Sequence, residues 1–407
     1  MKKGLIQTVG LTDGPIVASL RAHKPDFVVF LASEKSLPYV EQALAKAPVP
    51  GHKALRIRNP EDMNEVFAAG RKAHRLLKAA GVEAFLADPT GGTKTMAAGL
   101  TLALAGFGFT FVYVGGNKRD EAGRVVSGHE EVRQLQDPTE RFHVFEQRAF
   151  MQAWNGWRFR SALEFVARIL SEPGELSEAE TRYYEALRDI TQGMYEWDRF
   201  HHAAAYQRLT TALPQALEVA ETWRHPNKTR VLGALSSRLD ALETLRKDTQ
   251  SGHPTFAVLA DLLANAERRA ESGRFDDALA RLYRAVELAV EAHFYERHGM
   301  HLKNPNTWPE VLDERPSLKK QAREARGLFS IVEVAFNVAT GLGERGSFPQ
   351  RLYAQKETLH RLVMERNKSI LAHGVQPVEE KDYQALRDFL ASFGFEAAPP
   401  WPRWGEA

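Results

Sequence analysis

Two stretches near opposite ends of the chain carry residue types that could bind or cut a phosphodiester. The first is the glycine loop, residues 88–96, with the sequence Asp-Pro-Thr-Gly-Gly-Thr-Lys-Thr-Met. Paired glycines let backbone N–H groups approach an anion, while the threonine hydroxyls, Lys94 and a following helix N-terminus add donors and positive charge. The pattern predicts a phosphate-binding loop.

The glycine loop differs from two common nucleotide-binding motifs. A Walker A loop needs glycine at positions 88 and 93, where this chain has Asp88 and Thr93. The first apolar run ends in Gly10-Leu11-Thr12-Asp13-Gly14, which lacks the dinucleotide spacing. The sequence therefore disfavours an ATPase, and a strand–helix turn capped by threonine stays open as the structural alternative.

The second stretch contains Arg366, Asn367 and His373. On one helix, residues seven apart share a face two turns apart. An imidazole can move protons at a 2′-OH or a leaving oxygen, a guanidinium can neutralise the phosphate in the transition state, and Asn367 can orient either group. The set suits metal-free RNA cleavage. A surface arginine with a helix-terminal histidine is the alternative.

The same helix has an apolar stripe into which position 366 falls. A buried charge is costly unless it is paired. We therefore expect the stripe to pack against an identical helix, so that a homodimer brings two copies of the motif together. The stripe consists of Leu359, Leu362, Val363 and Ile370.

Up to about residue 145, short apolar runs alternate with helical patterns. This alternation predicts an α/β, doubly wound, mostly parallel sheet with helices on both faces. The expected strands are Gly4–Val9, Asp26–Ala32, Ala84–Asp88 and Phe109–Gly115, the expected helices 15–22, 37–47, 62–80 and 93–105, and a late hairpin pairs Arg124–Val126 with Val132–Gln136.

Ligands of doubly wound sheets bind beyond the carboxyl ends of strands. The segment Thr8–Thr12 and Ser33 follow neighbouring strands. We therefore expect them to share a crevice with residues 90–94, one that suits an oligophosphate ligand.

After residue 145 the apolar period is helical throughout, which predicts an all-α region. The tail 397–407 is rich in proline and tryptophan and is expected to lie across a surface, while Trp154, Trp157, Phe159 and Phe165 are expected at the seam between the halves. The expected helices are Phe145–Leu170, Glu178–Tyr195, Ala203–Glu221, Thr229–Lys247, Phe256–Glu271, Asp276–His298, Leu318–Asn337 and Tyr353–Ala372.

The composition narrows the class of protein. The 407 residues are 43% hydrophobic and 26% charged, with a net charge of +2, which excludes a disordered or collagen-like chain. The chain has no cysteine, which excludes disulfides and thiolate metal sites. We expect a cytoplasmic protein without a signal peptide or a membrane span. His293, His298 and His301 do not have the spacing of a metal site and are expected to be solvated.

Two motifs resemble known families. The string Asp-x-Thr-Gly-Gly-Thr-Lys-x-Met, preceded by Thr8-Val9-Gly10, resembles the CARF domain, the Rossmann-like sensor of type III CRISPR accessory proteins. The resemblance implies a domain at 1–145 that binds cyclic oligoadenylate on a two-fold axis. The implied activator-binding residues are Thr8, Gly10, Leu11, Thr12, Ser33, Asp88, Thr90, Gly91, Gly92, Thr93 and Lys94.

Arg366-Asn367-x5-His373 resembles the HEPN ribonuclease motif, and 277–288 resembles the first long helix of that domain. This implies a HEPN domain at 251–407 joined to the sensor by connecting helices at 146–250. Arg284 and Glu287 are expected to form a structural ion pair, with support of the catalytic residues as the alternative.

Together the resemblances imply an endoribonuclease of type III CRISPR antiviral defence. Cyclic oligoadenylate would activate cleavage of single-stranded RNA, with no metal or other cofactor and with a 2′,3′-cyclic phosphate product. The alternative is a non-catalytic sensor that recruits a partner, although such an adaptor has no need for an arginine on an apolar stripe.

Overall fold

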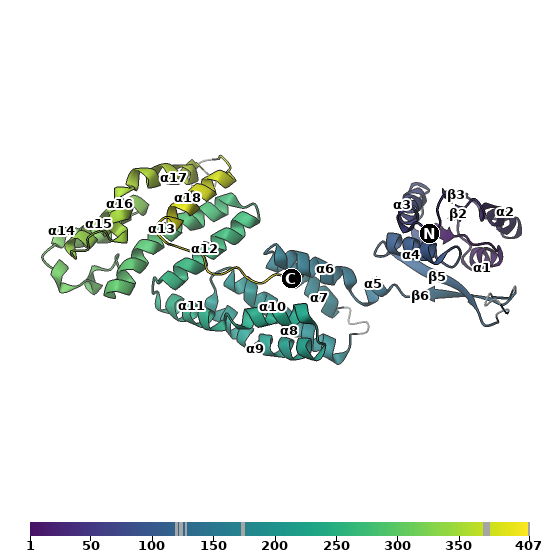
Figure 1. The fold of residues 1–407 in the computed structure, drawn as a ribbon, viewed down its shortest axis with the longest axis horizontal. Coiled ribbons are helices and arrows are strands. Elements are labelled where there is room, and N and C mark those ends of the chain that lie inside the picture. The colour runs from purple at the N-terminus through teal and green to yellow at the C-terminus, as the bar shows by residue number, and fades with distance from the viewer. Residues whose placement is uncertain (119–120, 122–124, 127, 172–175, 369–374, 406–407) are drawn as a thin grey trace. The chain divides into compact units, whose positions relative to one another are not determined.

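The computed structural model describes residues 1–118, 121, 125–126, 128–171, 176–368 and 375–405 (Figure 1). The chain forms two compact units, Met1–Phe145 and Glu146–Ala407. The first is built on a sheet, whereas the regular elements of the second, among the residues described, are helices.

The first unit contains a six-stranded sheet with the order β3-β2-β1-β4-β5-β6. All neighbouring pairs are parallel except β5 and β6, which are antiparallel. The doubly wound, mostly parallel fold predicted from the sequence is thereby confirmed. The strands are β1 (Lys3–Thr8), β2 (Phe27–Ser33), β3 (His52–Ile57), β4 (Ala84–Asp88), β5 (Phe109–Gly116) and β6 (Glu130–Leu135).

Apolar side chains on the two faces of the sheet form separate cores. Helices α1 (Gly14–His23) and α2 (Leu37–Lys46) cover one face, where Ile16 and Val40 pack against residues such as Phe30. Helices α3 (Met63–Ala79) and α4 (Lys94–Leu104) cover the other, where Val66 and Leu100 pack against Ile6. Strand β3 was not predicted, because it lies at the sheet edge and buries only Leu55 and Ile57.

The predicted late hairpin is wrong in its pairing. Strand β6 pairs with β5, placing Gly116 opposite Glu130 and Phe111 opposite Leu135, rather than with the segment 124–126. The buried strand β5 offers a long row of backbone partners at the sheet edge, and this row sets the register. Arg124 lies outside the described residues. The short helix α5 (Pro138–Arg141) follows.

The second unit has two hydrophobic cores. The first is formed by α6 (Val144–Asn155), α7 (Phe159–Ser171), α8 (Glu178–Trp197), α9 (His202–Thr222), α10 (Pro226–Ser236) and α11 (Leu239–Ser251). The second is formed by α12 (Phe256–Glu271), α13 (Phe275–His298), α14 (Pro316–Glu324), α15 (Leu328–Gly341), α16 (Phe348–Ala354), α17 (Lys356–Lys368) and α18 (Glu380–Ala391), with two short 3₁₀ turns, Pro305–Thr307 and Glu310–Leu312.

Four of the expected helices are each broken into two. The expected helix 145–170 turns between α6 and α7 at Trp157, whose φ is +57°, and the expected helix 318–337 breaks at Gly327, with φ +78°. The other breaks separate α10 from α11 and α16 from α17. Periodicity does not reveal these turns, because the apolar spacing continues across them. Helix α18 was not predicted.

The C-terminal tail lies across a surface, as expected. The Trp154 indole donates to the Pro402 carbonyl at 3.0 Å, and Arg238 donates to the carbonyls of Pro399 and Pro400 at 2.9 and 2.7 Å. Trp401 is 5% exposed. The tail therefore completes the first helical core.

The expectation that the tryptophan cluster forms a seam between the halves is wrong. Trp154, Trp157 and Phe159 are at most 4% exposed and belong to the core of the second unit, with Phe165 packed beside them. Part of the apolar surface that buries the cluster comes from the C-terminal tail, which is far away in the sequence. The periodicity of the sequence does not show that the tail packs at this position.

Candidate functional site: a sensor crevice and a nuclease helix

The sensor crevice lies where the order of the sheet reverses. Strand β2 lies on one side of β1 and β4 lies on the other, so the following helices pass to opposite faces and leave a gap at the carboxyl ends. The segment after β1 and the glycine loop after β4 line this gap, a crevice of about 580 Å³. The volume suits a nucleotide-sized ligand.

The structure brings together most of the predicted sensor residues. Seven of the eleven line the crevice, namely Thr8, Gly10, Leu11, Thr12, Thr90, Gly91 and Gly92. Leu11 is 61% exposed, so its side chain is available to a ligand. The lining does not include Ser33, Asp88, Thr93 or Lys94.

Two glycines of the loop are required by close contact and by backbone conformation. A Cβ at position 91 would lie 2.8 Å from the Gly10 nitrogen and still closer to the Thr8 carbonyl oxygen. Gly92 has φ +82°, a region that favours glycine. The loop therefore packs directly on the backbone that ends β1.

Asp88 holds the loop from beneath. Its carboxylate is fully buried and accepts hydrogen bonds from the Gln7 side-chain amide at 2.8 Å and the Thr90 backbone N–H at 2.9 Å. Burial raises the pKa of Asp88, although the hydrogen bonds from Thr90 oppose the shift. In this structure Asp88 positions the loop.

The hydroxyl of Thr90 also has a structural partner, because it accepts a hydrogen bond from the Val114 backbone N–H at 2.8 Å. Thr93 is the N-cap of α4, with its hydroxyl donating to the Pro60 carbonyl at 2.6 Å and accepting from the Met96 N–H at 3.1 Å. The strand–helix turn capped by threonine, which was the structural alternative from the sequence, is therefore present. The crevice expected of a ligand-binding loop is present as well. Lys94 is exposed, and Ser33 bonds Ser36.

The crevice contains residues that were not predicted, among them Gln7, Tyr113 and Glu130. Tyr113 is 38% exposed between buried neighbours on β5, so its ring offers a face to a ligand. An exposed aromatic residue in a buried strand is the sequence signal that could have revealed it. Glu130 reaches the crevice only because β6 pairs with β5.

The nuclease helix is α17. Leu359 and Val363 are at most 1% exposed in the core of the second unit, and Leu362 packs against that core. The expectation that this stripe is free to pack against an identical helix is therefore wrong, because α13 and its neighbours already cover it. Position 366 lies two turns after Leu359 on the same face of the helix.

Arg366 and Asn367 lie in the last turns of α17, and their side chains are outside the described residues, as are His373 and Ile370. The backbone places positions 366 and 367 just before the segment 369–379 that joins α17 to α18. The predicted motif therefore begins at the end of a helix anchored in the core.

Charged residues of α13 have structural partners. Arg284 pairs with Glu287 at 3.0 Å and with Glu291 at 2.8 Å, which confirms the predicted ion pair. His293 was expected to be solvated, and this is wrong: it is 4% exposed and contacts Glu344 at 2.8 Å. His298 contacts the same carboxylate at 2.7 Å. Glu344 comes from the distant turn after α15, so local spacing gave no sign of it.

Among the residues that the structure describes, no group of three histidine, aspartate or glutamate side chains is arranged to hold a metal ion. In the same part of the chain, no helix has the length and apolar character needed to cross a membrane.

Two domain models of one protein family match the chain. The Csm6 6H domain matches residues 142–239 and the Csm6 HEPN domain matches residues 247–395, together more than half of the chain. The HEPN match includes the whole of α17 and the segment that contains His373. A comparison with curated proteins finds no match.

Two solved structures are similar at low identity. Enterococcus italicus Csm6, bound to cyclic hexa-2′-fluoro-hexa-dAMP, is 12% identical over 96% of this chain and 93% of that chain, with a TM-score of 0.42. Can2 from Sulfobacillus thermosulfidooxidans, in complex with cyclic tetra-adenylate, is 15% identical over 46% of this chain and 58% of that chain, with a TM-score of 0.25.

Proposed function

This chain belongs to the Csm6 family of type III CRISPR accessory ribonucleases, and from that premise we propose that it is an endoribonuclease activated by cyclic oligoadenylate. The observation that carries the proposal is the HEPN match over 247–395, which contains Arg366, Asn367 and His373 in the spacing of an RNA-cleaving set. We further propose a sensor at 1–145, connecting helices at 146–250 and a nuclease domain at 251–407.

The activator site that we propose is the sensor crevice. Its glycine loop offers backbone N–H groups beside Thr90, and Tyr113 and Leu11 offer surfaces on which a base can lie. A phosphodiester ring of adenylates needs both kinds of contact. Asp88 and Thr93 contribute to activator binding by holding the loop in place. Lys94 and Ser33, which do not line the crevice, contribute from beside it.

The proposed chemistry needs no metal. The 2′-oxygen of RNA attacks the adjacent phosphorus, the bond to the 5′-oxygen breaks, and the products are a 2′,3′-cyclic phosphate and a 5′-hydroxyl. His373 accepts the 2′-proton or donates a proton to the 5′-oxygen. Arg366 neutralises the charge that develops on the phosphate, and Asn367 orients either group.

We propose that the active protein is a homodimer, since one Arg366 and one His373 are a sparse set for phosphoryl transfer. With Leu359 and Val363 covered by their own core, the dimer contact must use another surface of the helical unit. A ring with two-fold symmetry, bound between two sensor crevices, would shift the helical units relative to one another.

The testing experiment incubates the purified protein with end-labelled single-stranded RNA in EDTA, with and without cyclic tetra- or hexa-adenylate. We expect cleavage only with a ring, a cyclic phosphate end, and loss of cleavage in Arg366→Ala and in His373→Ala with ring affinity retained. Activity that EDTA abolishes and magnesium restores would contradict the metal-free mechanism. Ring binding without any cleavage would favour the adaptor.

A further inference from the structure

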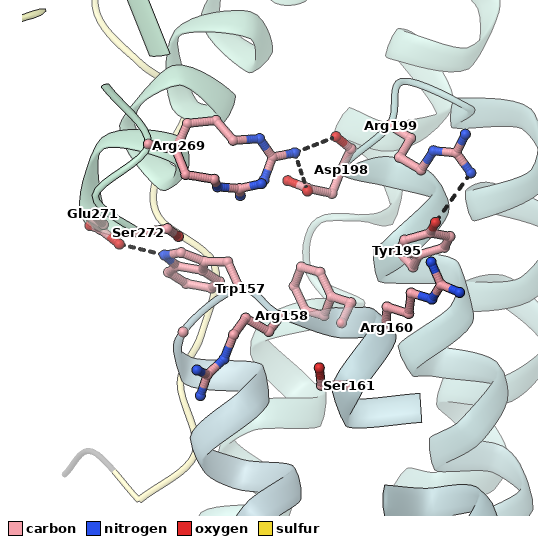
Figure 2. A pocket seen from close by; sticks show the side chains of 13 residues that line it. Trp157, Arg158, Arg160, Ser161, Tyr195, Asp198, Arg199, Arg269, Glu271 and Ser272 are labelled. Atoms are coloured by element: carbon pink, nitrogen blue, oxygen red, sulfur yellow. Dashed lines mark hydrogen bonds and ion pairs between the residues drawn. The ribbon is translucent and has the colours of Figure 1, made fainter. Parts of the chain in front are cut away.

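One pocket of the helical unit is lined by several arginines beside aromatic residues. This pocket, of about 710 Å³, lies among the α6–α7 turn, the end of α8 and the α12–α13 turn (Figure 2). It is called the arginine pocket here because five of its lining residues are Arg158, Arg160, Arg199, Arg269 and Arg274.

The two carboxylates of the arginine pocket are already neutralised. Asp198 is buried and accepts hydrogen bonds from Arg269 and, at 3.0 Å, from Arg268. Glu271 accepts from the Trp157 indole (Figure 2) and, at 2.6 Å, from Arg403. Neither carboxylate is therefore left to balance the remaining arginines.

Within the part of the chain that the structure describes, Arg158 and Arg160 have no carboxylate partner, whereas Arg199 interacts electrostatically with Glu196, a carboxylate that also contacts His201 at 2.7 Å. Arg158 and Arg160 are exposed at the start of α7, and Arg199 is exposed after α8, where it donates to the Tyr195 hydroxyl at 3.4 Å. Burial and the neighbouring Arg269 guanidinium lower the pKa of Arg274, although Asp277, which lies 3.9 Å from the Arg274 guanidinium, opposes the shift. The pocket thus has an excess of positive charge.

The arginine pocket also has features that suit a chain of nucleotides rather than a single small anion. Its charges come from separate segments spread around a volume far larger than one phosphate. The Arg199 guanidinium lies 5.2 Å from the centroid of the half-buried Tyr195 ring, so a cation and an aromatic face lie together. Such pairs bind single strands through phosphates and base stacking.

The pocket lies close to the first turn of α18. Phe275, next to Arg274, contacts the Tyr383 ring of α18 with a centroid separation of 6.4 Å. Helix α18 receives the segment 369–379 that leaves α17 after Arg366 and Asn367. The arginine pocket is thereby linked through Phe275 and Tyr383 to the helix that follows the cleavage motif in the chain.

We propose that the arginine pocket is a subsite for the phosphate backbone of single-stranded RNA, separate from the cleavage motif. The inference rests on the proposed function, because that function makes RNA the substrate. The subsite would hold nucleotides that flank the cut and would favour long substrates over short ones.

The test compares Arg158→Ala/Arg160→Ala/Arg199→Ala with Arg182→Ala/Arg188→Ala/Arg208→Ala, which removes the same charge from exposed positions elsewhere on α8 and α9. The probe is a fluorescent 2′-O-methyl RNA of about 20 nucleotides, which the proposed mechanism cannot cut. For the pocket variant we expect about tenfold weaker binding and a salt slope smaller by about 2, since each phosphate contact contributes ~0.7 on single strands.

Three outcomes would overturn the inference: unchanged RNA binding in the pocket variant, an equal loss in both variants, or a loss of affinity for cyclic oligoadenylate in the pocket variant. Circular dichroism checks that both variants fold. Because the readout is binding, it does not depend on Arg366 or His373. If variants of Arg366 and His373 still cleave RNA, the proposed function is contradicted. The RNA-binding measurement still tests the subsite in that case.

Discussion

At the scale of single residues, the contact between Gly91 and the end of β1 decides the shape of the sensor crevice. A methyl group at position 91 would overlap the Thr8 carbonyl and approach the Gly10 nitrogen to 2.8 Å, and both are backbone atoms that cannot rotate away. The glycine loop would have to lift from β1, and this would move Thr90, Gly91 and Gly92, which line the crevice.

We therefore expect Gly91→Ala to weaken binding of cyclic oligoadenylate by about 1–3 kcal/mol, the cost of misplacing one or more hydrogen bonds to a charged ligand. Isothermal titration calorimetry measures the change. Gly81→Asn is the control, because Gly81 has φ +72°, which asparagine tolerates, and no atom lies within 4 Å of an added Cβ. Equal affinity of Gly91→Ala and wild type would place the ring elsewhere.

The sequence predicted that the glycine loop lines a crevice, because Thr90, Gly91 and Gly92 directly follow the end of one strand. The same reasoning could not assign Asp88, Thr93 and Ser33 to supporting positions, since their partners Gln7, Pro60 and Ser36 are set by folding. Tyr113 and Glu130 were missed because each depends on how β5 and β6 pair.

At the scale of elements, Glu344 joins two histidines of α13 to the turn after α15. Burial lowers the pKa of His293, against the opposing effect of Glu344. Burial would raise the pKa of Glu344, but hydrogen bonds from His298 and His293 outweigh it and lower that pKa. In both cases the unfolded chain binds protons more readily than the folded one, so acid destabilises the fold.

We expect the free energy of unfolding of the helical unit to fall as the pH drops below about 6.5, the ordinary pKa of histidine, and to fall again below about 4.5, the ordinary value for glutamate. Denaturant titrations from pH 8 to 4 measure it. His293→Gln should flatten the first decline, whereas the exposed His360→Gln should not. A first decline that persists unchanged in His293→Gln would assign it to other groups.

Two elements were predicted with both ends correct, the short strand β4 and the helix α12. The breaks between α6 and α7 and between α14 and α15 were missed, because a turn such as Trp157 with φ +57° interrupts the backbone without interrupting the apolar spacing. Strand β3 was missed for the opposite reason, since an edge strand has too few buried residues to show a pattern.

At the scale of the whole molecule, the tail connects the two cores of the helical unit. The Ala398 N–H donates to the Ala260 carbonyl of α12 at 2.9 Å, and the Arg268 guanidinium lies 3.5 Å from the centroid of the Trp401 ring. Further along, Asn155 of α6 donates to the Trp404 carbonyl at 2.7 Å. The sequence predicted a surface strap, but its role in joining α12 to α6 follows only from the fold.

We expect deletion of residues 397–407 to split the unfolding of the helical unit into two transitions, because each core would then melt with less support from the other. Trp401→Ala should lower stability by about 3–5 kcal/mol, the usual cost of truncating a buried tryptophan, and Trp401→Phe by much less. Tryptophan fluorescence is a selective probe, since all 7 tryptophans lie in the helical unit. With the tail deleted, Trp308 reports the second core, whereas Trp154, Trp157 and Trp197 report the first. One cooperative transition at an unchanged midpoint would show that the cores are joined by their helices alone and that the tail only covers them.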